Sequence, residues 1–215
     1  YQEYGIDMFQ HLDGIFALGI YDDDTKELWV ARDGMGIKPL YYYSGNNRFI
    51  FCSEIKGMEP MLTDVELHLD RSSINRYLAF QYCPGDGTPY QEIHKVKPGE
   101  LICVKRGTIV NKKLFFKLPI FRHNNIKTKA SVKNVVDQLD VELRKAVHDQ
   151  MISDAPVGAF LSGGLDSTSI VAYAKEVDPN IRCFTIDTEK FSSEGVQDDL
   201  PYARAAAKYL NVPLD

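Results

Sequence analysis

The sequence predicts a chain of two unlike parts, an α+β part over residues 1–116 and an α/β part over residues 131–215. In the first part, short apolar and aromatic runs are separated by Gly, Asn and Asp, which is typical of antiparallel hairpins. After Ser131, apolar residues recur at helical spacing as far as Met151. Strand-like and helix-like runs then alternate, and this order predicts a parallel, doubly wound sheet.

The first part contains paired strand signals joined by polar turns. The pairs are Ile15–Tyr21 with Leu28–Ala31, Leu40–Tyr43 with Phe49–Cys52, and Glu100–Lys105 with Ile109–Val110. We expect alternate rings of the Tyr41–Tyr43 run to be buried, because successive side chains of a strand point to opposite faces. A short helix is expected over Ser72–Leu78, with Asp70 or Ser72 as its N-cap.

A polar, basic stretch, Phe121–Lys129, marks a linker over residues 117–130. Ser131 then caps a long amphipathic helix. The elements expected after it are a strand over Val157–Leu161, a helix over Thr168–Val177, a strand over Arg182–Ile186 and a helix over Asp199–Leu210. Asp198 or Asp199 is the expected N-cap of that last helix, and Asn211 ends it.

Composition places the chain among ordinary globular proteins. It has 215 residues, 44% of them hydrophobic, and a net charge of −5, which argues against a general nucleic-acid or acidic-membrane partner. No apolar stretch approaches the ~18 residues of a membrane span. The four cysteines stand singly within apolar runs, so we expect buried free thiols and a reducing compartment, the cytoplasm. The five histidines show no metal-ligand spacing.

The segment Ser162–Ser167, which reads Ser-Gly-Gly-Leu-Asp-Ser, lies between a predicted strand and a predicted helix. Glycines let the main chain approach an anion, and a helix N-terminus offers unpaired N–H groups. Asp166 would repel phosphates unless a hard divalent cation such as Mg²⁺ lies between them. The segment lacks the Gly-Lys-Ser/Thr of a Walker A motif. The alternative interpretation is an ordinary strand-to-helix turn in which Ser and Asp act as caps.

Ligands of parallel sheets bind at the carboxyl ends of the strands, which is where this loop lies. Leu161 and Ile186 stand at the ends of two such strands. They are candidates to contact a bound nucleotide. As apolar residues, they are equally typical of the buried core of a strand.

Two signatures resemble known families. The Ser162–Ser167 hexapeptide resembles the pyrophosphate loop of the ATP pyrophosphatases, a group that includes asparagine, GMP, NAD and argininosuccinate synthetases. Arg32–Tyr42, with Leu12–Ala17 before it and Ser53–Lys56 after it, resembles the back part of class II glutaminase domains. Within that block, turn chemistry explains the glycines, and Arg32 and Asp33 could form an internal ion pair.

The two signatures in this order resemble the glutamine-hydrolysing asparagine synthetase family. Phe80–Gly85 and Lys97–Glu100 resemble the domain junction of that family, so the likeness covers essentially the whole chain. The resemblance implies the C-terminal part of an antiparallel Ntn-hydrolase-type glutaminase domain, followed by the start of a PP-loop ATP pyrophosphatase domain.

The resemblance also implies a ligase that makes asparagine from aspartate, glutamine and ATP through an acyl-adenylate, with Mg²⁺ as cofactor. It implies small-molecule substrates, a possible homodimer, and neither nucleic-acid nor membrane partners. Asp166 would hold the metal. The residues implied to bind ATP and pyrophosphate are Leu161, Ser162, Gly163, Gly164, Leu165, Asp166, Ser167 and Ile186.

The chain starts at Tyr1, and its last residues, Val212–Asp215, enter what looks like another strand that does not finish, so we expect a piece truncated at both ends. The family's nucleophile is an N-terminal cysteine, and none of the four cysteines stands at that position, so no catalytic residue is assigned and the piece itself is expected to be inactive. Two alternatives remain open. One is an amidotransferase that acts on another carboxylate, such as a sugar acid, a peptide or a β-lactam precursor, and the other is a non-catalytic relative.

Overall fold

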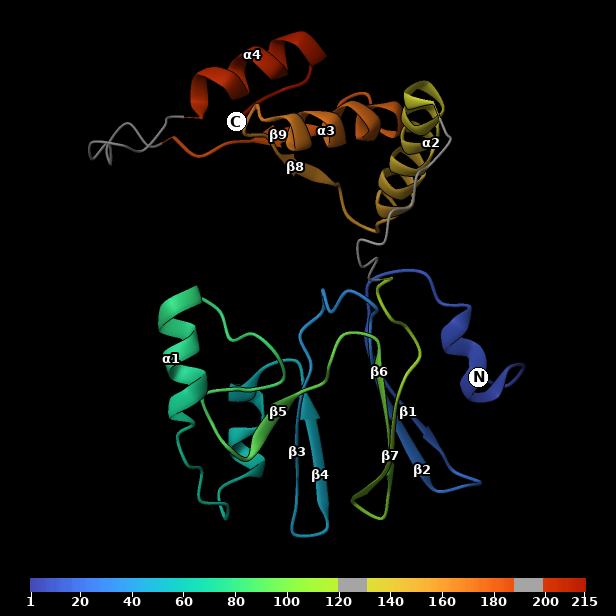
Figure 1. Ribbon diagram of the computed structural model, residues 1–215, viewed down its shortest axis with the longest axis vertical. Helices are drawn as coiled ribbons and strands as arrows, with labels where there is room; N and C mark the ends of the chain where they lie inside the picture. The colour runs from blue at the N-terminus through green and yellow to red at the C-terminus, as the bar shows by residue number, and fades with distance from the viewer. Residues whose placement is uncertain (120–130, 188–198) are drawn as a thin grey trace. The chain divides into compact units, whose positions relative to one another are not determined.

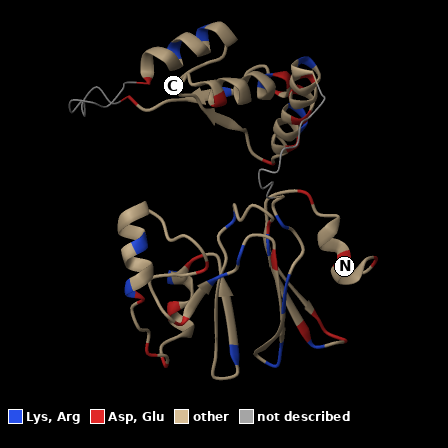
Figure 2. Ribbon diagram, in the orientation of Figure 1, with Lys and Arg blue, Asp and Glu red and all other residues tan. Residues whose placement is uncertain are grey.

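A computed structural model describes residues 1–119, 131–187 and 199–215. The expected linker stretch Phe121–Lys129 and Asp198 lie outside these ranges. The chain divides into two compact units, Tyr1–Arg122 and His123–Asp215, and each is described by itself. Positive and negative residues are interspersed along both units (Figure 2). Within the described ranges, no helix has the length and apolar character needed to cross a membrane.

The first unit contains two antiparallel sheets (Figure 1). One has the order β1-β2-β6-β7 and the other the order β4-β3-β5. The strands of the first are Ala17–Asp22, Glu27–Arg32, Glu100–Lys105 and Thr108–Leu114, and those of the second are Arg48–Cys52, Tyr41–Gly45 and Ile93–Lys95. The 3₁₀ helices η1, η2 and η3 span Gly5–Gln10, Ile55–Gly57 and Glu59–Met61, and helix α1 spans Arg71–Phe80.

The three expected hairpins are confirmed, and their turns have the expected backbone. Asn46 and Asn47 join β3 to β4 with φ of 51° and 54°, the left-handed pair of a type I′ turn. Arg106 and Gly107 do the same between β6 and β7. A Cβ on Gly107 would lie 1.9 Å from the carbonyl oxygen of Asn47, so the two turns pack too closely for a side chain there.

The two sheets face each other across a shared core, and a further core lies on the outer face of each. Val30, Tyr42 and Ile102 belong to the shared core. Tyr43 packs on the other side of its sheet, against Met58 between η2 and η3. The expectation that only alternate tyrosine rings are buried is therefore wrong, because β3 has a core on both faces; Tyr42 and Tyr43 are 6% and 5% exposed.

Arg32 and Asp33 do not form the expected ion pair, because each binds main-chain groups instead. Arg32 donates to the carbonyls of Gly36, Lys38 and Val96 at 2.6–2.9 Å. Asp33, 1% exposed, accepts main-chain N–H bonds from three residues that follow it: Met35 (3.2 Å), Ile37 (2.9 Å) and Lys38 (3.0 Å). Burial raises the pKa of Asp33, but the N–H donors outweigh burial and leave the pKa lowered.

Helix α1 begins as the sequence indicates. Asp70 is the N-cap, and its carboxylate accepts from Ser72 N (2.9 Å), Ser73 N (3.3 Å) and Ser73 Oγ (2.6 Å). Asp70 is therefore the cap, and Ser72 lies within the first turn.

The second unit contains a parallel strand pair covered on one side by helices. Strands β8 (Gly158–Phe160) and β9 (Arg182–Phe184) run parallel, and α3 (Leu165–Val177) and α4 (Leu200–Leu210) lie on one side of them (Figure 1). Leu214 forms a parallel bridge to Cys183, so a third extended segment continues the sheet beyond β9. The core between sheet and helices is built from Leu161, Val171, Ala174, Ile181, Cys183, Ala207 and Val212.

The boundaries of several elements differ from the prediction. Strand β9 ends at Phe184 rather than Ile186, and α3 begins at Leu165 rather than Thr168, so part of the loop forms the helix's first turn. Asp199 stands at the N-cap position of α4 but makes no side-chain cap bond. Asn211 ends that helix in the expected left-handed conformation, with φ of 52°.

The long helix α2 (Val132–Gln150) forms as expected, with Ser131 Oγ accepting from Asn134 N at 3.2 Å. Its apolar stripe is only partly covered by the described residues. Val147 packs on the core of the second unit, as does Met151 just beyond the helix. The stripe residues before them are exposed: Val132, Val135, Val136, Leu139 and Leu143.

All four cysteines are free thiols. Cys103 and Cys183 are buried, and burial raises the pKa of both thiols. Cys52 and Cys83 are only half-buried, so the expectation of buried thiols holds for two of the four.

Candidate nucleotide site

The segment Ser162–Ser167 links the end of β8 to the start of α3. Leu161 N donates to Phe184 O at 2.8 Å, which keeps the chain on the sheet up to the loop. Gly164 is the N-cap of α3 and no side chain caps the helix. The first-turn N–H groups, those of Leu165, Asp166 and Ser167, therefore have no side-chain acceptor, which is the arrangement that favours an anion.

The two glycines of the loop differ in what they require. Gly163 has φ of +78°, and a Cβ there would lie 2.2 Å from the carbonyl carbon of Tyr202 in α4. It is needed both for its left-handed backbone and for the close packing of the loop on α4. Gly164 has ordinary extended backbone, with φ of −72° and ψ of 165°, and a Cβ there would meet only Ser162 Oγ, at 3.4 Å. Packing therefore leaves Gly164 free to be another residue.

The hydroxyls of Ser162 and Ser167 hold the loop closed. The two Oγ atoms lie 3.0 Å apart, and Ser162 N donates to Ser167 Oγ at 3.3 Å. Gly164 N is 3.4 Å from Ser162 Oγ, a long contact that an incoming acceptor can replace. Ser162 is exposed and Ser167 is half-buried, so both hydroxyls reach the surface of the loop. Directly after Ser167, the buried hydroxyl of Thr168 has no hydrogen-bond partner in the described structure.

The predicted site residues fall into three places in the structure: Ser162–Ser167 on one loop, Ile186 in the segment after β9, and Leu161 directly after β8. Asp166, Leu165 and Ser162 are exposed on the loop, and the Ile186 side chain is 71% exposed beyond β9. Leu161, by contrast, is 1% exposed and lies in the core. The Leu161 side chain is therefore part of the strand core, which was the other interpretation of this residue. Only its main chain is near the loop.

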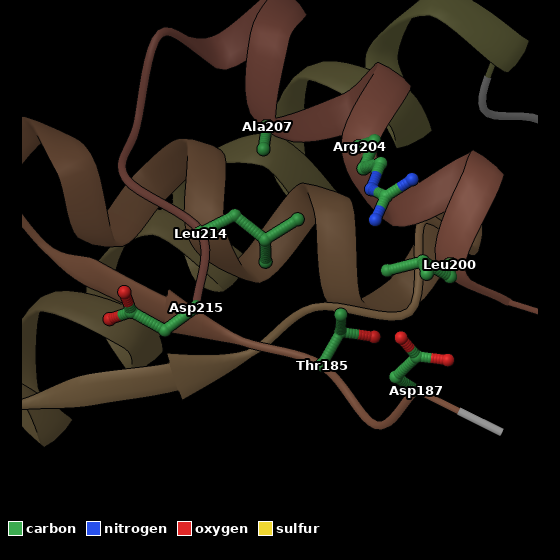
Figure 3. Close-up of a pocket in the computed structure, with 7 residues that line it drawn as sticks. All are labelled: Thr185, Asp187, Leu200, Arg204, Ala207, Leu214 and Asp215. Atoms are coloured by element: carbon green, nitrogen blue, oxygen red, sulfur yellow. The ribbon is translucent and has the colours of Figure 1, made fainter. Parts of the chain in front are cut away.

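A pocket of about 290 Å³ opens at the carboxyl end of β9, where the sheet meets α4. Figure 3 shows Leu200 and Arg204 of α4 facing Thr185 and Asp187, which follow β9. Arg204 is not among the residues that the sequence motifs predict for a site. The signal available in the sequence was the spacing of Leu200, Ala203, Arg204 and Ala207, which places one charged side chain on the same helix face as three apolar ones.

The hydrogen-bond donors and the carboxylate of the loop are chemically suited to a nucleoside triphosphate with Mg²⁺. The N–H groups and hydroxyls suit phosphate oxygens, and Asp166 supplies the single carboxylate that Mg²⁺ commonly takes beside substrate phosphates. Within the described ranges, no group of three or more His, Cys, Asp or Glu residues is placed to hold a metal by itself. A metal at Asp166 would therefore depend on phosphate oxygens for the rest of its coordination.

Comparison with known proteins agrees with both signatures. Residues 1–115 match the glutamine amidotransferase domain, and residues 138–214 match asparagine synthase. The chain belongs to the glutamine-hydrolysing asparagine synthetase family. Membership agrees with the mixed fold, in which antiparallel sheets precede a parallel strand pair.

Several relatives of this synthetase-family chain carry informative names. It is 35% identical over 194 residues to asparagine synthetase [glutamine-hydrolyzing] 1 of Bacillus subtilis (strain 168), covering 88% of this chain and 29% of that protein. It is 29% identical over 211 residues to putative asparagine synthetase [glutamine-hydrolyzing] 2 of Methanocaldococcus jannaschii, covering 97% and 39%. Amidase chry2 of Gibberella zeae is 26% identical over 229 residues, covering 100% and 33%. The chain thus spans 29–39% of the length of these relatives.

Proposed function

We propose that this chain is the central part of an enzyme that makes asparagine from aspartate, glutamine and ATP. The observation that carries the proposal is the uncapped start of α3 behind Gly164, joined to a glutaminase-type unit in the order that the family has. In this proposal residues 1–116 belong to the glutaminase domain, 117–130 are the linker and 131–215 begin a PP-loop, doubly wound synthetase domain. The enzyme would act in the cytoplasm on small molecules.

The reaction begins with attack of the aspartate side-chain carboxylate on the α-phosphorus of ATP. The bond from that phosphorus to the bridging oxygen breaks, which yields an acyl-adenylate and pyrophosphate. Ammonia from glutamine hydrolysis then attacks the acyl carbon, AMP leaves with its oxygen, and the extra proton goes to solvent. The products are asparagine and AMP.

The loop residues would act on the leaving pyrophosphate. The N–H groups of the first turn of α3 and the hydroxyls of Ser162 and Ser167 would donate to its oxygens as negative charge grows there. Asp166 would hold Mg²⁺, which neutralises phosphate charge when bound. Ile186, exposed beyond β9, would contact the adenine or ribose. Catalysis would come from positioning and charge stabilisation, with no covalent step on these residues.

ATP–pyrophosphate exchange tests the proposal in the full-length protein. We expect exchange of labelled pyrophosphate into ATP that requires Mg²⁺ and is stimulated by aspartate. Absence of exchange in a folded protein that still hydrolyses glutamine would refute the ATP site. The control omits aspartate, because without this carboxylate no acyl-adenylate forms that labelled pyrophosphate could attack.

The amidase relatives favour a second candidate for the acceptor. Two fungal proteins named as amidases, chry2 and chyE, match 100% of this chain at 26% identity. The same loop would then activate another carboxylate, such as that of a sugar acid, a peptide or a β-lactam precursor. Exchange stimulated by one of these and not by aspartate would favour this candidate and remove the asparagine assignment.

A further inference from the structure

A second pocket lies wholly within the first unit, and we call it the basic pocket. It has a volume of about 620 Å³, within the range of small-ligand sites, and it has no part in the nucleotide site described above. Arg32, Lys95 and Lys97 line it. Asp86 is the single carboxylate among the described residues of its lining, so the lining carries a net charge of +2.

Hydrogen bonds fix the walls of this pocket. Helix α1 stops at Gln81, whose φ of 61° turns the chain into the segment that forms one wall. Lys95 N donates to Asp86 O at 2.9 Å and ties this segment to β5. The Arg32 guanidinium, which also lines the pocket, donates to three main-chain carbonyls that fix its position. The cavity is therefore formed before any ligand arrives.

Two of the three cations lack a neutralising partner. Lys97 pairs with Asp86 at 3.2 Å, but Arg32 and Lys95 appear in none of the ion pairs made by the described part of the chain. The Lys95 ammonium donates instead to the carbonyl of Cys83. A carbonyl oxygen satisfies a hydrogen-bond donor but carries no full charge, so the positive charges of Arg32 and Lys95 are not neutralised where they are half-buried.

The protonation behaviour of Lys95 agrees with this geometry. Burial lowers the pKa of Lys95, and the charge of Arg32 acts in the same direction. The negative charge of a bound anion would raise the pKa of Lys95 and so oppose both effects. Tyr41 and Tyr82 also line the pocket, and aromatic residues offer an organic ligand apolar surface beside the charges.

We propose that the basic pocket binds a small organic anion through a carboxylate or phosphate group. Lys95 donates to the anion, and Arg32 and Lys97 contribute the surrounding positive charge. The volume exceeds what a bare anion fills, and the tyrosine rings pack on the remainder of the ligand. This is a site of the glutaminase-type unit, separate from the Ser162–Ser167 loop.

Isothermal titration calorimetry at constant ionic strength tests the proposal, with inorganic phosphate and L-glutamate as separate probes. We expect Lys95→Gln to weaken binding of the preferred probe roughly tenfold or more, as loss of a charged hydrogen bond does. Lys105→Gln is the matched control, since Lys105 pairs with Glu27 outside the pocket, and binding should change less than about twofold. A response to phosphate alone indicates a phosphate ester, and a response to glutamate alone indicates a carboxylate.

Lys97→Gln provides a second variant in case Lys95→Gln fails to fold, and it should weaken the same probe severalfold. Failure of both probes to bind the wild-type protein overturns the proposal. Equal binding by the wild-type protein and the pocket variants also overturns it, because the anion must then lie elsewhere. ATP–pyrophosphate exchange is measured in parallel and should not depend on Lys95. Failure of the anion proposal would therefore not affect the proposed adenylation, and the reverse also holds.

Discussion

Replacing each glycine of the Ser162–Ser167 loop by alanine separates a structural role from a proposed functional one. At Gly163 the new methyl group would lie 2.2 Å from a main-chain carbon of α4 while the residue stays at φ of +78°. The left-handed backbone costs about 1–2 kcal/mol and overpacking another 1–3. We therefore expect Gly163→Ala to lower the free energy of unfolding of the second unit by about 3 kcal/mol.

At Gly164 we expect the same change to have little effect on stability. The backbone already suits alanine, and the nearest atom, Ser162 Oγ, lies at 3.4 Å. Less freedom in the unfolded chain favours the variant, while alanine is a poorer N-cap than glycine, so stability should change by less than about 1 kcal/mol. If phosphate oxygens approach this N–H, however, the methyl group obstructs them, and ATP–pyrophosphate exchange should fall at least tenfold.

Urea denaturation of the two variants and exchange assays on the full-length protein make the comparison. The expected pattern is an unstable Gly163→Ala and a stable, inactive Gly164→Ala. A Gly164→Ala protein with wild-type stability and wild-type exchange would show that phosphate does not approach this residue. Equal destabilisation by both changes would refute the packing argument.

Further predictions concern what holds each unit together. Asp33→Ala should destabilise the first unit by on the order of 3 kcal/mol, because it leaves buried N–H groups without an acceptor. The folded-state pKa of Asp33 is lowered, so its carboxylate stabilises the fold above about pH 4, and this stabilisation is lost as the pH falls through the lowered pKa. The midpoint of urea denaturation should therefore depend less on pH in the acid range for Asp33→Asn than for the wild type. Arg144→Met removes two exposed ion pairs, one with Asp140 within α2 and one with Glu176 of α3, and should lower the free energy of unfolding by no more than about 1 kcal/mol. In 0.5 M salt the difference from wild type should become smaller; a loss of about 3 kcal/mol would mean that the pairs are effectively buried.

Local signals in the sequence predicted most of the elements. The left-handed turn at Asn46–Asn47, the Asp70 cap and the Ser131 cap each depend on residues within a few positions of one another. The burial of both Tyr42 and Tyr43 could not be predicted in this way, because it depends on a second core contributed by segments distant in sequence. Of the main-chain partners of Arg32 and Asp33, only Val96 is distant in sequence. The others lie within six residues, but side-chain bonds to a nearby irregular loop leave no pattern of residue types in the sequence.

As with the fold, the sequence predicted the local features of the candidate site but not those that depend on distant segments. The hexapeptide indicated the loop, but the separate requirements of Gly163 and Gly164 appeared only with α4 in place. Arg204 reaches the pocket beside β9 from a helix nearly forty residues along the chain, so no spacing rule connects it to the loop. The assignment of Leu161 to the core likewise needed the packing around it.

The central claim is that Asp166 serves the adenylation reaction alone, and Asp166→Asn in the full-length protein tests it directly. The side chain is exposed and bonds no other described residue, so the fold should be unaffected. We expect Mg²⁺-dependent ATP–pyrophosphate exchange to be lost while glutamine hydrolysis continues at close to the wild-type rate. Exchange that survives the substitution, or loss of both activities in a folded protein, would contradict the role given to this carboxylate.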